Sequence, residues 1–314
     1  MSELNFGDCI GCGLCILGCP AYEETGFDLL TARGRNKGLQ AGLEASELVE
    51  SIWACTLCGY CDAICPSDVA NVDIVLHLRR ELVLSEAEGR VEGLVLSEAE
   101  GLVLSEAEGP VLSEPEGRVE GRVEGLVLGC TIRERAPYLI ASIREFLSRI
   151  GRSSVESSDV CCGSLEVESG RAVRVKVKAG VVADPICLEQ YNAEFLGVLA
   201  MQHLEHFDLE PPFYYYAPHR LINRDHARMY PLYDRLRQRF DCDMNFDLNR
   251  LARSTSAGSL QGLSGHHARD IPAAVARLLA HSRAERIVTC SPADYLAFKA
   301  YSGRDTRYIT ECLR

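Results

Sequence analysis

Apolar residues in the first eighty positions recur at helical spacing. Over 45–52 they occupy positions i, i+3, i+4 and i+7, one face of a helix that leads into Cys55. A second stripe of this kind covers 75–82. The residues are Ala45, Leu48, Val49 and Ile52 in the first stripe, and Val75, Leu78 and Leu82 in the second. This part of the chain is therefore predicted to be α-helical, without a β-hairpin.

A different pattern begins beyond residue 80. The octapeptide LVLSEAEG stands at 82–89, 94–101 and 102–109, a variant PVLSEPEG follows at 110–117, and RVEG units are interspersed. A period of eight with a glycine closing each unit fits neither a helix nor a solenoid of known repeat length. Residues 81–127 are therefore predicted to form a solvated, disordered low-complexity insert. A stacked repeat structure or a partner-binding arm is the alternative.

Helix-like and strand-like segments alternate over 128–314. A helix with an apolar face is predicted from Pro137 to a stop at Gly151. Strands are predicted at Val181–Ala183 and Ile287–Thr289, and further helices from Pro272 and from Pro292. The stretch from Arg171 to Lys178 alternates like a strand. The fold class is therefore α+β: an α-helical module over 1–80, the insert over 81–127, and an α/β domain over 128–314.

The net charge of −12 belongs mostly to the insert. Residues 81–127 hold twelve Glu and three Arg, a balance of −9, which leaves about −3 for the rest of the chain. No clustered basic face is present, so we expect no nucleic-acid partner. No apolar run approaches the ~20 residues that span a bilayer, and no export signal is evident. We expect a cytoplasmic protein, not an integral membrane protein; a peripheral place on a membrane complex stays open.

Fifteen cysteines are too many to be incidental in a chain of this kind. Two runs share the spacing C-x2-C-x2-C-x3-C-P, which is the spacing of bacterial two-cluster ferredoxins. They are Cys9, Cys12, Cys15 and Cys19, followed by Pro20, and Cys55, Cys58, Cys61 and Cys65, followed by Pro66. A pair of structural zinc sites is the weaker interpretation, because such sites take two cysteines per knuckle.

The spacing also predicts which cysteines share a cluster. Three cysteines two residues apart let one tight loop reach three corners of a cubane, so the fourth ligand comes from the other run. The predicted ligands are Cys9, Cys12, Cys15 and Cys65 for one [4Fe–4S] cluster, and Cys55, Cys58, Cys61 and Cys19 for the other. Gly11, Gly13 and Gly59 leave backbone N–H groups free to approach the sulfurs.

The 35 residues between Cys19 and Cys55 contain a predicted helix. With the segment Thr31-Ala-Arg33-Gly34-Arg35, residues 1–80 resemble the α-helical ferredoxin module. That module occurs in iron–sulfur subunits of heterodisulfide reductase, anaerobic glycerol-3-phosphate dehydrogenase, and glycolate or lactate oxidase. The resemblance implies electron transfer between a flavoprotein dehydrogenase or other redox subunit and a disulfide, quinone or similar acceptor.

The same resemblance implies a cysteine-rich "CCG" domain after the insert. Cys130, Cys161, Cys162 and Cys187 are then candidate ligands of a third, noncubane [4Fe–4S] cluster. Asp184, however, stands where the closing C-P-x-C element has its first cysteine, and a carboxylate is a poorer ligand for this core. Redox-silent, buried cysteines are the alternative.

The second half of this domain departs further from the family pattern. Ser256-Ala257-Gly258 replaces the second CCG, Tyr216–Arg220 replaces an H-D-P-C-H element, and Cys290 remains while Ala293 replaces its partner. We therefore expect no cluster there. A mononuclear metal site from His203, His206, His219, His266 and His267 is less favoured than ordinary surface or core histidines. No dinucleotide or flavin fingerprint is present, so a flavin would sit on another subunit.

These patterns favour a non-catalytic electron-transfer subunit of an oxidoreductase, and they assign no catalytic residue. A thiol–disulfide reductase acting at Cys161 and Cys162 is the second hypothesis. A scaffold with a decayed second domain is the third.

Overall fold

The computed structural model describes residues 4–97, 125–156, 162–171, 179–191, 193–263 and 269–314. Three features of the sequence lie outside these residues: the strand predicted within 171–178 (except Arg171), Cys161, and the pair His266–His267. Over the described part of the chain, no helix is both long and apolar enough to cross a membrane.

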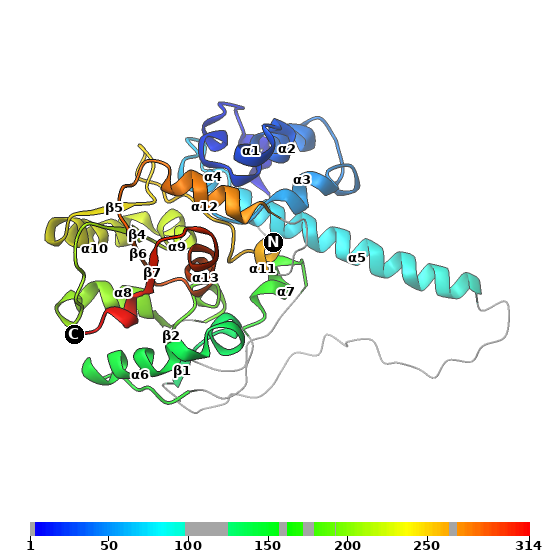
Figure 1. The fold of residues 1–314 in the computed structure, drawn as a ribbon. Helices are drawn as coiled ribbons and strands as arrows, with labels where there is room; N and C mark the ends of the chain where they lie inside the picture. Colours follow the sequence, from blue (N-terminus) through cyan, green and yellow to red (C-terminus); the bar gives the residue numbers. More distant parts are fainter. Residues whose placement is uncertain (1–3, 98–124, 157–161, 172–178, 192, 264–268) are drawn as a thin grey trace.

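The regular structure of residues 4–97 is helical, as the apolar stripes predicted, and no strand occurs among them (Figure 1). Short 3₁₀ turns at Asn5–Asp8, Leu14–Gly18, Asp28–Leu30 and Ala45–Glu47 alternate with five α-helices. These are α1 (Pro20–Thr25), α2 (Ala32–Gln40), α3 (Val49–Ala54), α4 (Tyr60–Ala63) and α5 (Asn71–Ser97). Both cysteine runs lie in the loops and turns between these helices.

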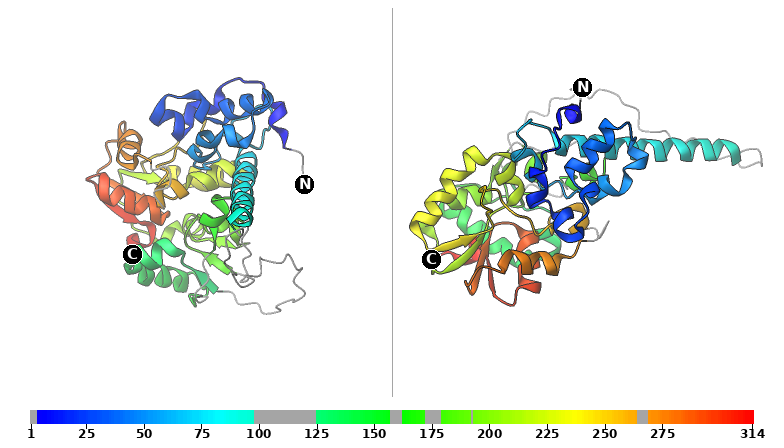
Figure 2. Two further views of the ribbon diagram at one scale, coloured as in Figure 1. Left: turned by 90° about the vertical axis from the view of Figure 1, so that its right-hand side faces the viewer. Right: turned by 90° about the horizontal axis from the view of Figure 1, so that it is seen from above.

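Helix α5 does not stop at the boundary predicted at residue 80. It continues through the first repeats to Ser97, and its second half extends past the rest of the molecule (Figures 1 and 2). Local sequence favours this continuation, because leucine, glutamate and alanine are good helix formers and only two glycines interrupt the segment. Residues 98–124 lie outside the described part of the chain.

The insert also ends earlier than expected. Gly125–Val127 is strand β1, and Leu126 and Val127 are buried. It pairs in parallel with β2 (Ala179–Val182), which pairs in parallel with β3 (Glu194–Phe195). The strand lies inside the range predicted for the insert because its Gly-Leu-Val sequence also occurs in the repeats, so nothing local marks it. Helices α6 (Ile140–Arg149), α7 (Ser164–Glu168) and α8 (Leu196–Gln202) belong to this half.

The second sheet has four parallel strands in the order β5-β4-β6-β7. They are β4 (Phe213–Tyr216), β5 (Cys242–Met244), β6 (Arg286–Thr289) and β7 (Asp305–Tyr308). The associated helices are α9 (His219–Arg224), α10 (His226–Arg239), α11 (Leu260–Leu263), α12 (Ile271–Leu279) and α13 (Pro292–Tyr301). The predicted α6, α12 and α13 and the predicted β2 and β6 are therefore confirmed, and the α+β class with them.

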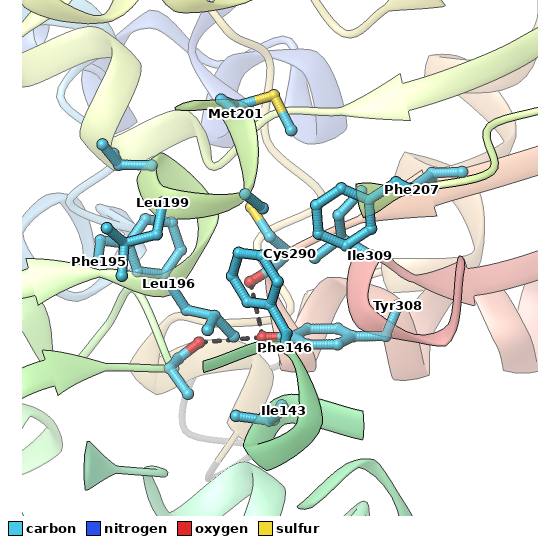
Figure 3. Close-up of a cluster of buried hydrophobic side chains, with 14 of the residues drawn as sticks. Ile143, Phe146, Phe195, Leu196, Leu199, Met201, Phe207, Cys290, Tyr308 and Ile309 are labelled. Atoms are coloured by element: carbon cyan, nitrogen blue, oxygen red, sulfur yellow. Dashed lines mark hydrogen bonds between the residues drawn. The ribbon is translucent and has the colours of Figure 1, made fainter. Parts of the chain in front are cut away.

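One apolar core joins the two sheets. It includes Leu126 and Val181 from the first sheet and Tyr215 and Val288 from the second. The buried hydroxyl of Tyr308 donates to the carbonyls of Ala183, at 3.1 Å, and Cys290, at 3.2 Å (Figure 3). These carbonyls follow the ends of β2 and β6, so one side chain ties both sheets together.

Candidate metal centres

Two cavities in the helical N-terminal part are lined by cysteines. The first is lined by Cys9, Cys12, Cys15, Cys61 and Cys65. The second is lined by Cys15, Cys19, Cys55, Cys58 and Cys61. The last cysteine of each run thus lies at the cavity of the other run, and the two cavities share Cys15 and Cys61 as a common wall.

The two cysteine loops have the same backbone conformation. Gly11 and Gly13 flank Cys12 with φ of +74° and +83°, and Leu57 and Gly59 flank Cys58 with φ of +53° and +75°. Left-handed residues on both sides of the middle cysteine curl each loop around its cavity. Backbone N–H groups point at two sulfurs of the second run: Leu57 donates to Cys55 Sγ and Val69 to Cys65 Sγ, each at 3.5 Å.

The cysteine thiols are poorly solvated. Burial, together with neighbouring thiols in the same cavities, raises the pKa of Cys15 to about 11 and that of Cys58 to about 12. Several thiols so placed cannot ionise together unless cations replace their protons. Soft thiolate donors around a closed, largely apolar cavity are the donor set that iron–sulfur clusters take. The residues present therefore fit [4Fe–4S] clusters.

The segment Thr31–Arg35 serves both cavities. Arg33 lines the first cavity and its Nε donates to the Gly11 carbonyl at 3.1 Å. Arg35 is 1% exposed, lines the second cavity, and donates to the Ser51 carbonyl at 2.9 Å. Each cavity thus has one guanidinium beside it, where it would offset the negative charge of a thiolate-bound cluster.

Later parts of the chain hold the second cysteine loop. Gln261 donates to the carbonyls of Trp53 and Cys55, both at 2.7 Å. The Thr56 carbonyl accepts from Arg220 at 3.1 Å, and the Cys58 carbonyl accepts from Asn223 at 3.0 Å. Arg79 and Arg269 also donate to carbonyls of this loop, at Cys55 and Ala54. Sequence reasoning assigned none of these residues to the cysteine loop: Arg220 was noted only within the replaced element Tyr216–Arg220, and the others lie in no motif.

A buried ion pair anchors this contact. Arg220 Nη1 lies 2.6 Å from Glu168 Oε1, and both side chains are less than a tenth exposed. Arg79 donates to the Glu168 carbonyl at 2.6 Å. Glu168 ends α7, the helix that begins two residues after Cys162. The second cysteine cavity and the candidate CCG site are therefore connected through one short helix.

Three of the four cysteines predicted for a third cluster lie near one another; the fourth, Cys161, is outside the described residues. Cys187 hydrogen-bonds the sulfur of Cys162, which lowers the pKa of Cys162 to about 6 and raises that of Cys187. Cys130 is close enough to Cys187 to raise its pKa further. Burial raises the pKa of Asp184 to about 7. Asp184 Oδ2 is buried and has no hydrogen-bond partner among the described residues.

This unpartnered oxygen bears on whether a metal-containing group fits here. A buried carboxylate oxygen beside thiols is stabilised by a cation and costs free energy without one. Among the described residues, however, only His203, Glu205 and His206 bring three potential ligand atoms within 4.8 Å of one another. The sulfur atoms of Cys130, Cys162 and Cys187 and the carboxylate of Asp184 therefore do not bring three ligand atoms close enough together to bind a single metal ion.

The described histidines of the less favoured metal site do not come together as one group. His203 and His206 lie at a 3₁₀ turn over Leu204–His206. His219 is buried elsewhere, with ring nitrogens 3.0 Å from the Tyr216 hydroxyl and 3.1 Å from that of Ser254. It belongs to a buried polar network, not to a site with the other two.

The second half shows no gathering of cysteines around the replaced motifs among the residues that the structure describes. Cys290 lies in the apolar core (Figure 3). The Tyr215 hydroxyl donates to its sulfur at 3.3 Å. Burial raises its pKa to about 12. Ala293 packs in a different cluster, with Tyr216 and Ala257. These residues act as packing groups.

Comparison with known proteins supports the N-terminal assignment. Residues 5–69 match the 4Fe–4S dicluster domain. One relative belongs to the ferredoxin/F420H2-dependent CoB–CoM heterodisulfide reductase of Methanosarcina acetivorans; it is 33% identical over 96 residues, 30% of this chain and 53% of that protein. The glycolate oxidase iron–sulfur subunit of Escherichia coli K12 is 30% identical over 94 residues, 29% of this chain and 23% of that protein.

A further relative is the fumarate reductase iron–sulfur subunit of Escherichia coli O6:H1. It is 31% identical over 75 residues, 21% of this chain and 31% of that protein. The chain thus spans about half or less of the length of these relatives. No solved structure matches. The resemblance inferred from the cysteine runs is confirmed for the N-terminal part, which is a [4Fe–4S] cluster-binding domain.

Proposed function

We propose that this chain is an electron-transfer subunit that relays single electrons through two [4Fe–4S] clusters, on the premise that residues 5–69 are a 4Fe–4S dicluster domain. The observation that carries the proposal is the pair of cysteine cavities with Cys15 and Cys61 in their common wall. A bound cluster supplies a reversible one-electron step. The chain supplies spacing, burial and N–H···S bonds, which set the potential.

The surroundings of the two cavities suggest a direction. Cys12 is exposed, and apolar side chains surround the first run: Ile10 is 69% and Leu17 55% exposed. Exposed apolar side chains gathered at one place are typical of a contact with another protein. The second loop, in contrast, is covered by α9 and α11. We therefore assign the first cavity to exchange with a partner and the second to transfer toward the C-terminal part.

The partner in this proposal is a flavoprotein dehydrogenase or a comparable redox subunit, because no flavin or nicotinamide fingerprint occurs in the sequence. The acceptor is a disulfide, a quinone or a similar molecule. We place the complex in the cytoplasm, free or peripherally bound to a membrane.

Iron and acid-labile sulfide analysis of anaerobically purified protein tests the cluster number. Two cubanes require about eight irons per chain. Cys312→Ser serves as control, because this buried cysteine is remote in sequence from both runs. A value near four would contradict the two-cluster relay.

Serine variants test the exchanged ligands. Cys12→Ser and Cys58→Ser mark the EPR signals of the first and second clusters. With exchanged fourth ligands, Cys19→Ser changes the same signal as Cys58→Ser, and Cys65→Ser the same signal as Cys12→Ser. If Cys19→Ser instead matches Cys12→Ser, each run binds its own cluster and the assignment is wrong.

A second candidate function is thiol–disulfide chemistry at a third, noncubane cluster held by Cys130, Cys161, Cys162 and Cys187. The convergence of the three described cysteines and the unpartnered oxygen of Asp184 favour it. About twelve irons per chain would support this function. An EPR spectrum left unchanged by Cys162→Ser would exclude it.

A further inference from the structure

An open cavity of about 470 Å³ lies beside the outer strand of the second sheet. Strand β5 is the last strand on that side, so its far edge has no neighbour among the described strands (Figure 1). The turn after β5, the end of α12 and one residue of α10 form the walls. No cysteine lines this cavity, and neither the sequence motifs nor the comparisons assign it a role.

The lining is cationic in an acidic protein. Four arginines contribute to it, Arg237, Arg250, Arg253 and Arg277, against two carboxylates, Asp243 and Asp247. The chain as a whole carries −12. The side chains that line this concave surface therefore include two more positive than negative groups, although the whole chain is negative. Such a surface favours anionic ligands.

The two lining carboxylates are already engaged. Asp243 accepts from Ser282 Oγ at 2.7 Å. Asp247 accepts from the Tyr60 hydroxyl at 2.5 Å and from the backbone N–H of Asn249 at 2.8 Å. These hydrogen bonds hold both side chains in place and occupy oxygens that could otherwise accept from the guanidiniums.

The arginines, in contrast, retain donors. Arg250 is paired with Asp234 at 2.5 Å. Arg253 and Arg277 share one carboxylate, Glu23, at 3.3 Å and 3.9 Å. No ion pair or hydrogen bond of Arg237 occurs within the described residues. Two guanidiniums thus share one carboxylate and the third has none among the described residues, a situation that a bound carboxylate or phosphate relieves.

Unpartnered polar atoms reinforce the argument. Tyr214 lines the cavity, is 2% exposed, and its hydroxyl has no hydrogen-bond partner among the described residues. The Nε atoms of Arg253 and Arg277 lack hydrogen-bond acceptors in the same part of the chain. Donors left unsatisfied at a cavity cost free energy that an acceptor in the cavity recovers.

The cavity also adjoins the second cysteine loop. Tyr60, which bonds Asp247, lines the second cysteine cavity and follows Cys58 by two residues. Arg253 donates to the Leu17 carbonyl at 3.4 Å, close to Cys19 in the first run. A molecule bound here would therefore be separated from the second cysteine cavity by the Tyr60 side chain.

We propose that this cavity binds a small organic anion, whose carboxylate or phosphate is held by Arg237, Arg253 and Arg277 and whose apolar part packs on Phe246 and Leu278. The charge is recognised by the guanidiniums, and the mixed lining accommodates a ligand of metabolite size. The site stands on charge and geometry alone. It does not depend on the electron-transfer function, and a failure of one leaves the other standing.

Calorimetric titration of the full, oxidised chain with inorganic phosphate and with succinate tests the proposal. We expect saturable one-to-one binding of at least one anion, weakened by added salt. Binding of phosphate alone assigns a phosphate ligand; binding of succinate alone assigns a carboxylate. No saturable binding of either anion up to about 10 mM would overturn the proposal.

Matched variants locate the binding. Arg237→Gln and Arg277→Gln are each expected to weaken binding about tenfold, the usual effect of one lost charge-assisted hydrogen bond. Arg235→Gln is the control, since Arg235 lies on the same helix as Arg237, is also exposed, and does not line the cavity. Equal weakening by Arg235→Gln would show non-specific attraction and contradict the site. Iron content measured on each variant verifies that the cluster-binding part is intact.

Discussion

Leu57 adopts a backbone conformation that a glycine adopts at the equivalent place in the other loop. Its φ of +53° matches that of Gly11 at +74°. A left-handed residue with a side chain costs about 1–2 kcal/mol. Leu57 is 2% exposed and packs with Val72 and Val75, and burying a leucine offsets that cost. Two different residues therefore give the same loop, one by conformational freedom and the other by packing.

His219 predicts a pH effect on stability. Burial lowers its pKa to about 3, whereas a histidine in the unfolded chain titrates near 6.5. Between these values the unfolded state binds a proton that the native state does not, so stability falls as pH falls, by up to about 1.4 kcal/mol per pH unit. His219→Gln removes this dependence. The check is denaturant unfolding of both proteins at about pH 7 and pH 5.5.

The effect of His219 on the pH dependence of stability must be separated from that of Asp184. Asp184, whose pKa is raised to about 7, opposes the histidine over the same range, because its unfolded form releases a proton that the native form keeps. The comparison must therefore be between variant and parent, in which Asp184 cancels. The exposed His226→Gln is the control. Identical pH dependence of His219→Gln and the parent protein would contradict the prediction.

At the scale of elements, helix α2 depends on close contact of its backbone with the preceding turn. A Cβ atom at Gly34 would lie 2.3 Å from the Asp28 carbonyl oxygen and 2.5 Å from Leu29 Cα. Only glycine permits this approach, and the approach places Arg33 and Arg35 on either side, one at each cysteine cavity. Close packing of the backbone therefore requires glycine at position 34. This packing in turn positions Arg33 and Arg35.

Gly34→Ala is expected to destabilise the protein by about 1–3 kcal/mol, because backbone atoms cannot move aside as a flexible side chain can. Gly38→Ala on the same helix is the matched control. Its Cβ would meet only the side-chain ends of Leu43 and Leu48, at 3.2 Å and 3.1 Å, and alanine favours a helix over glycine by about 1 kcal/mol. Denaturant midpoints and iron content measure both effects. Equal stability of the two variants would show that the contact at Gly34 is not limiting.

At the scale of the whole molecule, the helical module is fixed to the rest of the chain by polar contacts to backbone carbonyls. The second cysteine loop is held from α9 and α11, and the buried pair Arg220–Glu168 lies beneath it. Figure 2 shows the module resting against these elements in both views. The C-terminal part therefore acts as a structural support for the second cluster site.

Arg220→Gln tests that support. Removing one partner of a buried ion pair leaves Glu168 uncompensated and costs about 3–5 kcal/mol. We expect loss of iron from the second site first, with the EPR signal marked by Cys58→Ser lost before the other. Arg228→Gln is the control, since Arg228 is exposed and lies 3.9 Å from Asp225. Retention of both signals in Arg220→Gln would contradict this role.

Much of the candidate site was predictable because its chemistry is local. Cysteines at fixed spacing around Cys12 and Cys58 predict cluster binding without tertiary information, since one tight loop supplies three ligands. Gln261, Arg220 and Asn223 could not be predicted, because each contacts the loop across more than 160 residues and has no motif of its own. The arginine-lined cavity was missed for the same reason.

The repeats show most clearly where local sequence stops being decisive. The tetrapeptide Gly-Leu-Val-Leu stands at 93–96, at 101–104 outside the described residues, and at 125–128. The copy at 93–96 is part of helix α5, and the copy at 125–128 begins strand β1. Residues 93–96 continue a helix already formed, and a helix needs only its own hydrogen bonds. Residues 125–127 instead pair with β2, some fifty residues away.

The sequence by itself determined the two cysteine loops, the helical character of the first eighty residues and the main α/β elements after the insert. Each rests on spacing, periodicity or turn residues within a few positions. Only the tertiary structure decided which Leu-Val-Leu became a strand, which carbonyls the arginines reach, and where cationic side chains gather. Those outcomes depend on burial and pairing between distant segments, and no short window of sequence carries that information.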